Sequence, residues 1–381
     1  MKSTRVLGVT GFALIAVTYG MARFSWGLML PAVTRDIPFS PRMAGVLSAC
    51  SFAAYCLSVT AASRLAERFG PKLPAAAAAG CAAIGLLLLA LSSGPVMLAA
   101  GLFIAGTGPG LASPSLAAAV SQRVEEKKQP QVNTIINAGT GCGIILSVPI
   151  LLYLPGGWRA ACVVFAACAL ACLIPVIRSL PGEGIRRDGE KQGWRETLVQ
   201  RPVLRLVIIA FVSGMASAGW WSFGPEILQH HSGVDADTTS LLWLVSGGAG
   251  IAGALTGPVA SLIGMNPVYR LSQLFMAAPL LLLAFLHHFS WWLLPAVALC
   301  GVGYITLSGV LLVYGASATK AAPATGVGVV FFTLAAGQVA GSLVFGTLYS
   351  SAGAVIALTL FAALGGVVML VLPQGNDGSG R

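Results

Sequence analysis

Residues 20–31 read GMARFSWGLMLP, and residues 214–225 read GMASAGWWSFGP. The two stretches share glycine, methionine, alanine, tryptophan and proline at matching positions, 194 residues apart. The same shift carries Gly70 to Gly264. A constant offset in two separate regions predicts an internal duplication, in which one structural unit occurs twice.

Both stretches lie in long apolar runs, and the whole chain has that character. Of its 381 residues, 56% are hydrophobic and only 9% are charged, whereas a soluble domain carries roughly a quarter charged residues. Apolar runs of about 20 residues, the length needed to cross a bilayer, recur along the sequence. The chain is therefore predicted to be an integral membrane protein with almost nothing left for a soluble domain.

We predict an all-α membrane protein with twelve transmembrane helices. The predicted spans are residues 6–31, 43–62, 74–92, 95–119, 131–153, 159–177, 203–224, 239–262, 268–286, 291–315, 324–349 and 352–372. The longest polar segment of the chain separates the sixth helix from the seventh. The predicted units are therefore an N-terminal six-helix bundle over 1–177, a cytoplasmic linker over 178–202 and a C-terminal six-helix bundle over 203–381.

The net charge of +10 does not indicate nucleic-acid binding, because of where the basic residues lie. With both termini placed inside, eighteen of the 22 Lys and Arg residues fall in inward segments, and only Arg35, Arg42 and Arg159 fall outside. This surplus follows the positive-inside rule. We therefore expect a multi-pass protein of the bacterial plasma (inner) membrane with both termini in the cytoplasm.

The sequence shows no pattern typical of catalysis or of cofactor binding. All eight cysteines fall within predicted helices without a paired spacing alongside histidine, so packing residues are expected rather than disulfides or a zinc site. No phosphate-binding glycine loop with a following lysine and no nucleophile elbow is present. We therefore expect the protein not to be an enzyme and to use no cofactor and no metal.

The segment after the second predicted helix, residues 63–72, reads SRLAERFGPK. It resembles the loop signature Gly-x-Leu-Ala-Asp-Arg-Phe-Gly-x-Lys of the major facilitator superfamily, with Arg68, Gly70 and Lys72 matching and Glu67 in place of the aspartate. The resemblance implies a transporter with two pseudo-symmetric six-helix bundles. It also implies that the acid lies near the start of the eleventh helix and holds the inner side closed. The alternative is that these charges only anchor the loop at lipid headgroups.

Other parts of the chain also resemble this superfamily, so that the resemblance covers essentially its whole length. Gly157-Trp158-Arg159 before the sixth helix is one such segment. The first-helix pattern Gly-x-x-Arg-Phe resembles a poorly characterised bacterial branch. Leu102 stands where many members carry arginine, and the fifth helix lacks the Gly-Pro pair of drug and proton antiporters. Both departures weigh against drug export.

Arg23 is the only formal charge predicted at depth in the membrane, where a guanidinium costs about 3 kcal/mol even on lenient insertion scales. The planar fork of arginine suits a carboxylate. We therefore predict that Arg23 binds a small organic anion between Trp26 and Trp220. An alternative of equal weight is that Arg23 bonds to helix-end carbonyls or reaches Asp36 or Glu226 at the outer mouth.

Polar and aromatic side chains at helical spacing complete the predicted cavity. We predict that the substrate is bound by Tyr19, Arg23, Trp26, Asn137, Ser217, Trp220, Trp221, Tyr304 and Gln338. Taken singly, each tryptophan fits core packing or an interfacial belt about as well, and each amide fits a bond to a neighbouring helix as well. Glycine tracts in the fifth, eighth and eleventh helices are expected to form the interface on which the two halves rock.

The sequence thus predicts a secondary active transporter that moves a small molecule, preferably a small organic anion, by alternating access. Its expected partners are the substrate, the lipid bilayer and a proton as a second cargo, without nucleic acid and as a monomer. Glu226 is the candidate proton site, since no carboxylate is predicted in the core; a uniporter, an exchanger or a proton carried on the substrate are alternatives. The competing functions are an exporter of hydrophobic drugs or metabolites and a non-transporting sensor on the same scaffold.

Overall fold

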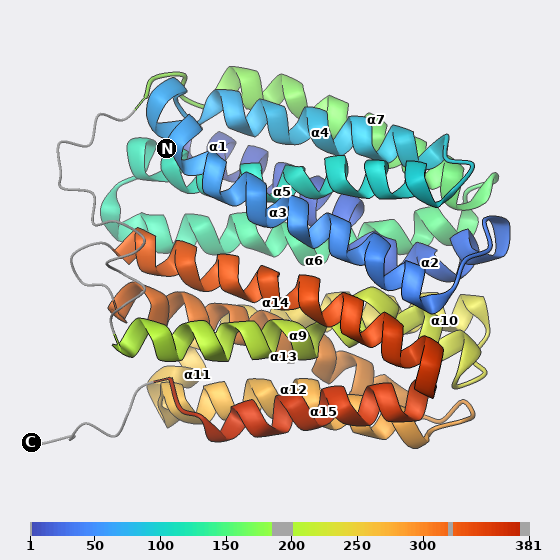
Figure 1. Ribbon diagram of the computed structural model, residues 1–381. Coiled ribbons are helices and arrows are strands. Elements are labelled where there is room, and N and C mark those ends of the chain that lie inside the picture. Colours follow the sequence, from blue (N-terminus) through green and yellow to red (C-terminus); the bar gives the residue numbers. More distant parts are fainter. Residues whose placement is uncertain (1, 185–200, 319–322, 374–381) are drawn as a thin grey trace, which may run out of the picture.

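The structure is a computed structural model that describes residues 2–184, 201–318 and 323–373. Helices lie side by side along one common direction throughout this part of the chain (Figure 1). Most of the predicted linker, 185–200, lies outside the described residues. The elements are α1 Lys2–Ile15, η1 Ala16–Phe24, α2 Ser25–Asp36, α3 Pro41–Phe69, α4 Lys72–Ala90, α5 Pro95–Arg123, η2 Glu126–Lys128, α6 Gln129–Tyr153, α7 Gly157–Ser179, α9 Arg201–His230, α10 Ala236–Gly250, η3 Ile251–Leu255, α11 Thr256–Ile263, α12 Met265–Phe285, α13 Leu293–Ala318, α14 Pro323–Ala352 and α15 Ala354–Leu370.

The described residues contain ten helical segments that are long and apolar enough to cross a membrane. An eleventh span is formed by α10 and α11 together, which are bent by 56° at the break between them. The apolar helix α15 is shorter than these. With α15 included, the helices correspond in order to the twelve predicted spans, so the all-α membrane fold is confirmed.

The first membrane helix, Thr4–Asp36, is not a uniform α-helix. Between α1 and α2 it winds as a π-helix over Ala16–Phe24, which carries both Tyr19 and Arg23. The backbone N–H of Ser25 bonds to the carbonyl of Gly20, five residues earlier. Widened turns of this kind are rare and occur mostly at functional sites. This segment therefore sets the direction in which Arg23 points.

The internal duplication is visible in the backbone. Gly70 ends α3 with φ +78°, and Gly264 ends α11 with φ +88°. Both conformations are readily available only to glycine, because any Cβ atom is crowded at these angles. Pro31 and Pro225, the other pair of the repeat, lie inside α2 and α9. The two halves of the sequence thus use matched residues for the same local geometry.

Glycines bring the first and fifth helices together, and the seventh and eleventh in the same way. A Cβ atom on Gly143 of α6 would clash with the carbonyl oxygen of Ala16 in the first helix. A Cβ atom on Gly337 of α14 would clash with the carbonyl oxygen of Phe211 in α9. Each contact joins two helices of one half. Gly143 and Gly337 therefore do not lie between the halves, although α14 packs on α3 of the other half, as expected of the eleventh helix.

Other glycines of the same tracts do face the opposite half, where α6 meets α10. A Cβ atom on Gly141 would lie 2.9 Å from Cγ1 of Ile251, and one on Gly247 would clash with Ile144. These contacts confirm the expectation for the fifth and eighth helices. The halves therefore meet here with little side chain between their backbones, as small residues allow in membrane helices.

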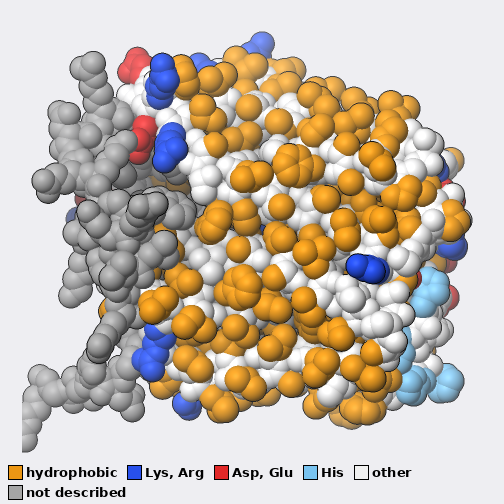
Figure 2. Space-filling view, viewed as in Figure 1, with side chains coloured by type: hydrophobic (Ala, Val, Ile, Leu, Met, Phe, Trp, Pro, Cys, Tyr) orange, Lys and Arg blue, Asp and Glu red, His pale blue; other side chains and the backbone are white. Residues whose placement is uncertain are grey.

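The two ends of the molecule differ in charge. Figure 2 shows a face covered by hydrophobic side chains, with Lys and Arg gathered at the end where α1 begins and α15 ends. Histidine side chains gather at the opposite end. An apolar belt between two polar ends is the surface expected of a chain that spans a bilayer.

Candidate substrate-binding site

Arg23 lies at the centre of a buried cluster and is only 7% exposed. Its Nη2 donates a hydrogen bond of 3.0 Å to Oε1 of Gln338 on α14. Its guanidinium carbon lies 4.4 Å from the ring centroid of Tyr55 and 4.8 Å from that of Phe52. Its Nε is buried without a partner among the described residues. The positive charge is thus held by an amide oxygen and aromatic faces rather than by a carboxylate.

Gln338 connects this cluster to two further helices. It is buried, and its Nε2 donates to the hydroxyl of Tyr304 on α13 at 3.1 Å and to Oγ of Ser217 on α9 at 3.4 Å. Four of the predicted substrate residues, Arg23 included, therefore meet in one hydrogen-bonded group. They come from the first, seventh, tenth and eleventh helices, although as much as 315 residues separate them.

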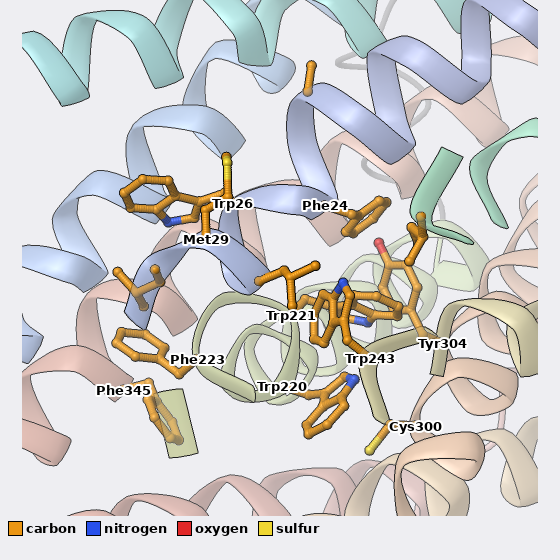
Figure 3. Close-up of a cluster of buried hydrophobic side chains, with 14 of the residues drawn as sticks. Phe24, Trp26, Met29, Trp220, Trp221, Phe223, Trp243, Cys300, Tyr304 and Phe345 are labelled. Atoms are coloured by element: carbon orange, nitrogen blue, oxygen red, sulfur yellow. The ribbon is translucent and has the colours of Figure 1, made fainter. Parts of the chain in front are cut away.

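Trp221 forms one wall of the group. Its ring centroid lies 5.3 Å from that of Tyr304 and 4.8 Å from that of Phe24 (Figure 3). Phe24, Phe52 and Tyr55 surround Arg23 but are absent from the predicted set. The sequence does carry signals for two of them: Phe24 directly follows the arginine, and Tyr55 belongs to a row of buried polar residues on α3 at helical spacing, with Ser48, Ser51 and Ser58.

Tyr19 extends the polar group to the fourth membrane helix. Its hydroxyl lies 2.8 Å from Oγ of Ser113 on α5 and donates to the hydroxyl of Tyr55 at 3.4 Å. Its ring centroid is 5.8 Å from the guanidinium carbon of Arg23. Side chains of the first, fourth, seventh and tenth membrane helices therefore meet around Arg23.

Trp26 and Trp220, the matched tryptophans of the repeat, each donate a hydrogen bond to a serine. Nε1 of Trp26 donates to Oγ of Ser48 at 2.9 Å, and Nε1 of Trp220 donates to Oγ of Ser246 at 3.1 Å. Each bond ties a tryptophan to the next membrane helix of its own half. Figure 3 shows Trp26 apart from the group of Phe24, Trp221 and Tyr304, and the placement of an anion between the two tryptophans stays a prediction.

Replacing Trp26 by phenylalanine is expected to lower stability by about 1–3 kcal/mol, because the buried hydroxyl of Ser48 loses its donor. Binding of an anion at Arg23 should remain unchanged within about twofold. Thermal unfolding of the purified protein and a ligand-binding titration measure the two effects. A tenfold loss of affinity for the anion at unchanged stability would mean that Trp26 contacts the ligand.

Two predicted residues stand apart from the cluster. Asn137 on α6 is exposed and is not among the hydrogen-bond partners of Arg23 or Gln338. Oε1 of Glu226 lies 3.1 Å from Nδ1 of His230, near the end of α9. Its Oε2 is buried without a partner in the described part of the chain. Glu226 therefore belongs to the histidine-bearing end of the molecule.

The loop that resembles the superfamily signature packs on the segment after α7. The backbone N–H of Lys72 donates to the carbonyl of Pro181 at 3.1 Å, and Gly70 abuts Gly182. The guanidinium carbon of Arg68 lies 5.1 Å from the ring centroid of Phe69. The expected contact of the motif's acid, Glu67, with the start of the eleventh helix involves side chains at 323–325, which lie outside the described residues.

The Gly-Trp-Arg segment at the start of α7 contacts the end of α2, at the end of the first bundle opposite the signature loop. Nε1 of Trp158 and Nη1 of Arg159 both donate to Oδ2 of Asp36, at 2.8 and 2.6 Å. The guanidinium of Arg159 also stacks 4.2 Å from the ring centroid of Trp158. The carboxylate of Asp36, at the end of α2, thus accepts hydrogen bonds from Trp158 and Arg159. The alternative in which Arg23 reaches Asp36 is therefore not what the structure has.

Membrane-spanning helices that enclose a buried polar cluster, shared between two similar halves, are typical of helical membrane transporters. The chain matches the Major Facilitator Superfamily over residues 12–342 and belongs to that family.

A curated relative is a gentisate transporter of Corynebacterium glutamicum, 24% identical over 259 residues. The match covers 60% of this chain and 57% of the relative, so the chain spans less than two thirds of that relative's length. Among solved structures, a point mutant of the nucleoside transporter NupG is similar with a TM-score of 0.80 at 14% identity, over 96% of this chain and 98% of that one. A POT family transporter in complex with 5-aminolevulinic acid is similar with a TM-score of 0.80 at 14% identity, over 97% and 95%.

Proposed function

We propose that the protein is a secondary active transporter that moves a small organic anion across the bacterial plasma membrane, with Arg23 as the anion-binding residue. One observation carries the proposal: a buried guanidinium whose hydrogen-bond partner is a neutral amide and whose Nε has no partner in the described residues. A buried charge without an opposite charge is costly, and an ionisable group at membrane depth usually marks a substrate pathway.

Aromatic carboxylates are the first substrates to test. The walls around Arg23 are aromatic, formed by Phe24, Phe52, Tyr55, Trp221 and Tyr304. Rings of this kind pack well against an aromatic ligand. The relative's substrate, gentisate, combines a carboxylate with an aromatic ring, which supports the same class for this chain.

Alternating access is supported by contacts between the halves at the histidine-bearing end. A Cβ atom on Gly27 of α2 would lie 2.7 Å from the carbonyl oxygen of Trp221 on α9. Gly45 of α3 approaches the backbone of Ser342 on α14 as closely. We propose that the bundles 1–177 and 203–381 rock about the cluster as a monomer, with both termini in the cytoplasm, and that these contacts open and close.

Counterflow of labelled gentisate into proteoliposomes tests the function. The expected result is saturable uptake that benzoate inhibits and neutral benzamide does not. Flux of hydrophobic cations without carboxylate flux would favour the drug-exporter alternative. Ligand binding without any flux would favour the sensor, and the absence of both binding and flux for every carboxylate would overturn the proposal.

Glu226 is the proposed site of proton coupling, because one of its carboxylate oxygens is buried with no hydrogen-bond partner among the described residues while the other lies beside His230. Glu226→Gln is expected to abolish uptake driven by a pH gradient and to leave counterflow intact, since counterflow needs no net proton movement. Asp237→Asn, at an exposed position of α10, is the matched control and should change neither. Gradient-driven uptake that persists in Glu226→Gln would remove Glu226 from coupling.

A further inference from the structure

The side chain of Gln338 joins the two halves at the anion-binding residue. Gln338 lies on α14, Arg23 lies on the first membrane helix, and the 3.0 Å bond between them runs from one half to the other. A substrate carboxylate would have to place its oxygen where Oε1 of Gln338 now lies, if it is to use the same Nη2 donor. The amide and the substrate therefore compete for one donor.

The orientation of the amide follows from the chemistry of its neighbours. Arginine can only donate hydrogen bonds, so the amide must turn its oxygen to Arg23. Its nitrogen then faces the hydroxyls of Tyr304 and Ser217, which accept. Gln338 is only 1% exposed, and its side-chain nitrogen and oxygen both have partners. The side chain is held in one geometry that presents a neutral oxygen to a charged donor.

A carboxylate makes a stronger bond than this amide does. Charge-assisted hydrogen bonds are roughly twice as strong as neutral ones, and the guanidinium fork can bond both oxygens of a carboxylate. The Nε of Arg23 has no hydrogen-bond partner in the part of the chain that the structure describes, so a carboxylate would gain a second bond that Gln338 does not make. A neutral carboxamide ligand would offer Arg23 only an amide oxygen, the same acceptor that Gln338 already supplies.

We propose that Gln338 is an internal stand-in for the substrate: its amide oxygen occupies the position of a substrate carboxylate oxygen. It accepts the hydrogen bond of Arg23 between transport events, and the substrate carboxylate displaces it. The displacement breaks a hydrogen bond between the two halves, so that α14 can separate from the first helix. This inference rests on the proposed anion transport. It makes Gln338 a specificity-determining residue, since only a ligand that binds arginine better than an amide can enter.

Two substitutions test the competition in opposite directions. Gln338→Met removes the competitor and is expected to tighten gentisate binding by at least threefold. Gln338→Glu supplies a permanent carboxylate and is expected to weaken gentisate binding at least tenfold, while it raises the unfolding temperature without ligand. Gln273→Met is the matched control: Gln273 is equally buried on α12 but bonds to Ser213, so affinity should not change.

The outcomes separate this inference from the proposed function. Weaker binding in Gln338→Met, with wild-type binding intact and lost in Arg23→Met, would show that Gln338 contacts the substrate directly and would overturn the stand-in alone. If no carboxylate in a panel with gentisate and benzoate shifts the unfolding temperature of the wild type, both proposals fall. Gln338→Asn, one methylene shorter, gives the same comparison should the methionine variant not fold.

Discussion

Arg23→Met is expected to weaken the binding of gentisate and related carboxylates by about 100-fold, which corresponds to about 2.7 kcal/mol. A hydrogen bond to a charged group contributes about 1.5–3 kcal/mol, and Arg23 is the only charged side chain among the described residues of the cluster. Methionine has a similar length and is apolar, so the variant removes a buried charge rather than creating one. The variant also takes the donor from the buried Oε1 of Gln338, which costs about 1–3 kcal/mol and offsets the gain from removing a buried charge. We therefore expect the protein to fold with an unfolding temperature close to that of the wild type.

Arg23→Lys separates charge from geometry. Lysine keeps the charge but lacks the planar fork that bonds both oxygens of a carboxylate, so an intermediate loss of about tenfold is expected. Isothermal titration with gentisate measures both variants, and Arg42→Met, at an exposed position near the start of α3, is the control for loss of an arginine. Wild-type affinity in a folded Arg23→Met protein would leave Arg23 with a structural role only.

The membrane fold could be predicted from the sequence because a bilayer imposes the length and apolarity of each span. The constant offset that pairs Gly70 with Gly264 predicted the duplication, and the two glycines share a positive φ. The π-helix at Ala16–Phe24 and the break at Ile251–Leu255 were not predictable in this way. The π-helix packs on α6 and the break packs mainly on α13, and composition and periodicity do not record such backbone packing.

Only part of the binding site could be predicted from the sequence. A single charge at depth identified Arg23, and polar spacing identified Gln338, which lies 3.0 Å away although it is 315 residues later. The rotation of each helix about its axis decides where a side chain points, and spacing does not fix it. Trp26 therefore bonds to Ser48, while Tyr55, which is absent from the predicted set, lies against the guanidinium.

Gly143→Val is expected to be the most destabilising single change in the first half, by about 3 kcal/mol, the upper part of the range for overpacking. A Cβ atom at Gly143 would clash with the carbonyl oxygen of Ala16, and one at Gly20 would clash with the backbone of Gly143. Backbone cannot rotate aside as a side chain can, so α6 must move away from the first helix. That helix carries Arg23, and we expect the folded fraction of the variant to lose gentisate binding as well.

The measurement is thermal unfolding of the purified variant, with Gly80→Val on α4 as the control, because nothing lies within 4 Å of a Cβ atom there. An equal unfolding temperature for the two variants would mean that the close approach at Gly143 is not needed. Gly337 makes the equivalent contact with Phe211 in the second half, so Gly337→Val should cost about as much stability. A large loss in Gly143→Val without one in Gly337→Val would instead mean that the duplicated contact stabilises only the half that carries Arg23.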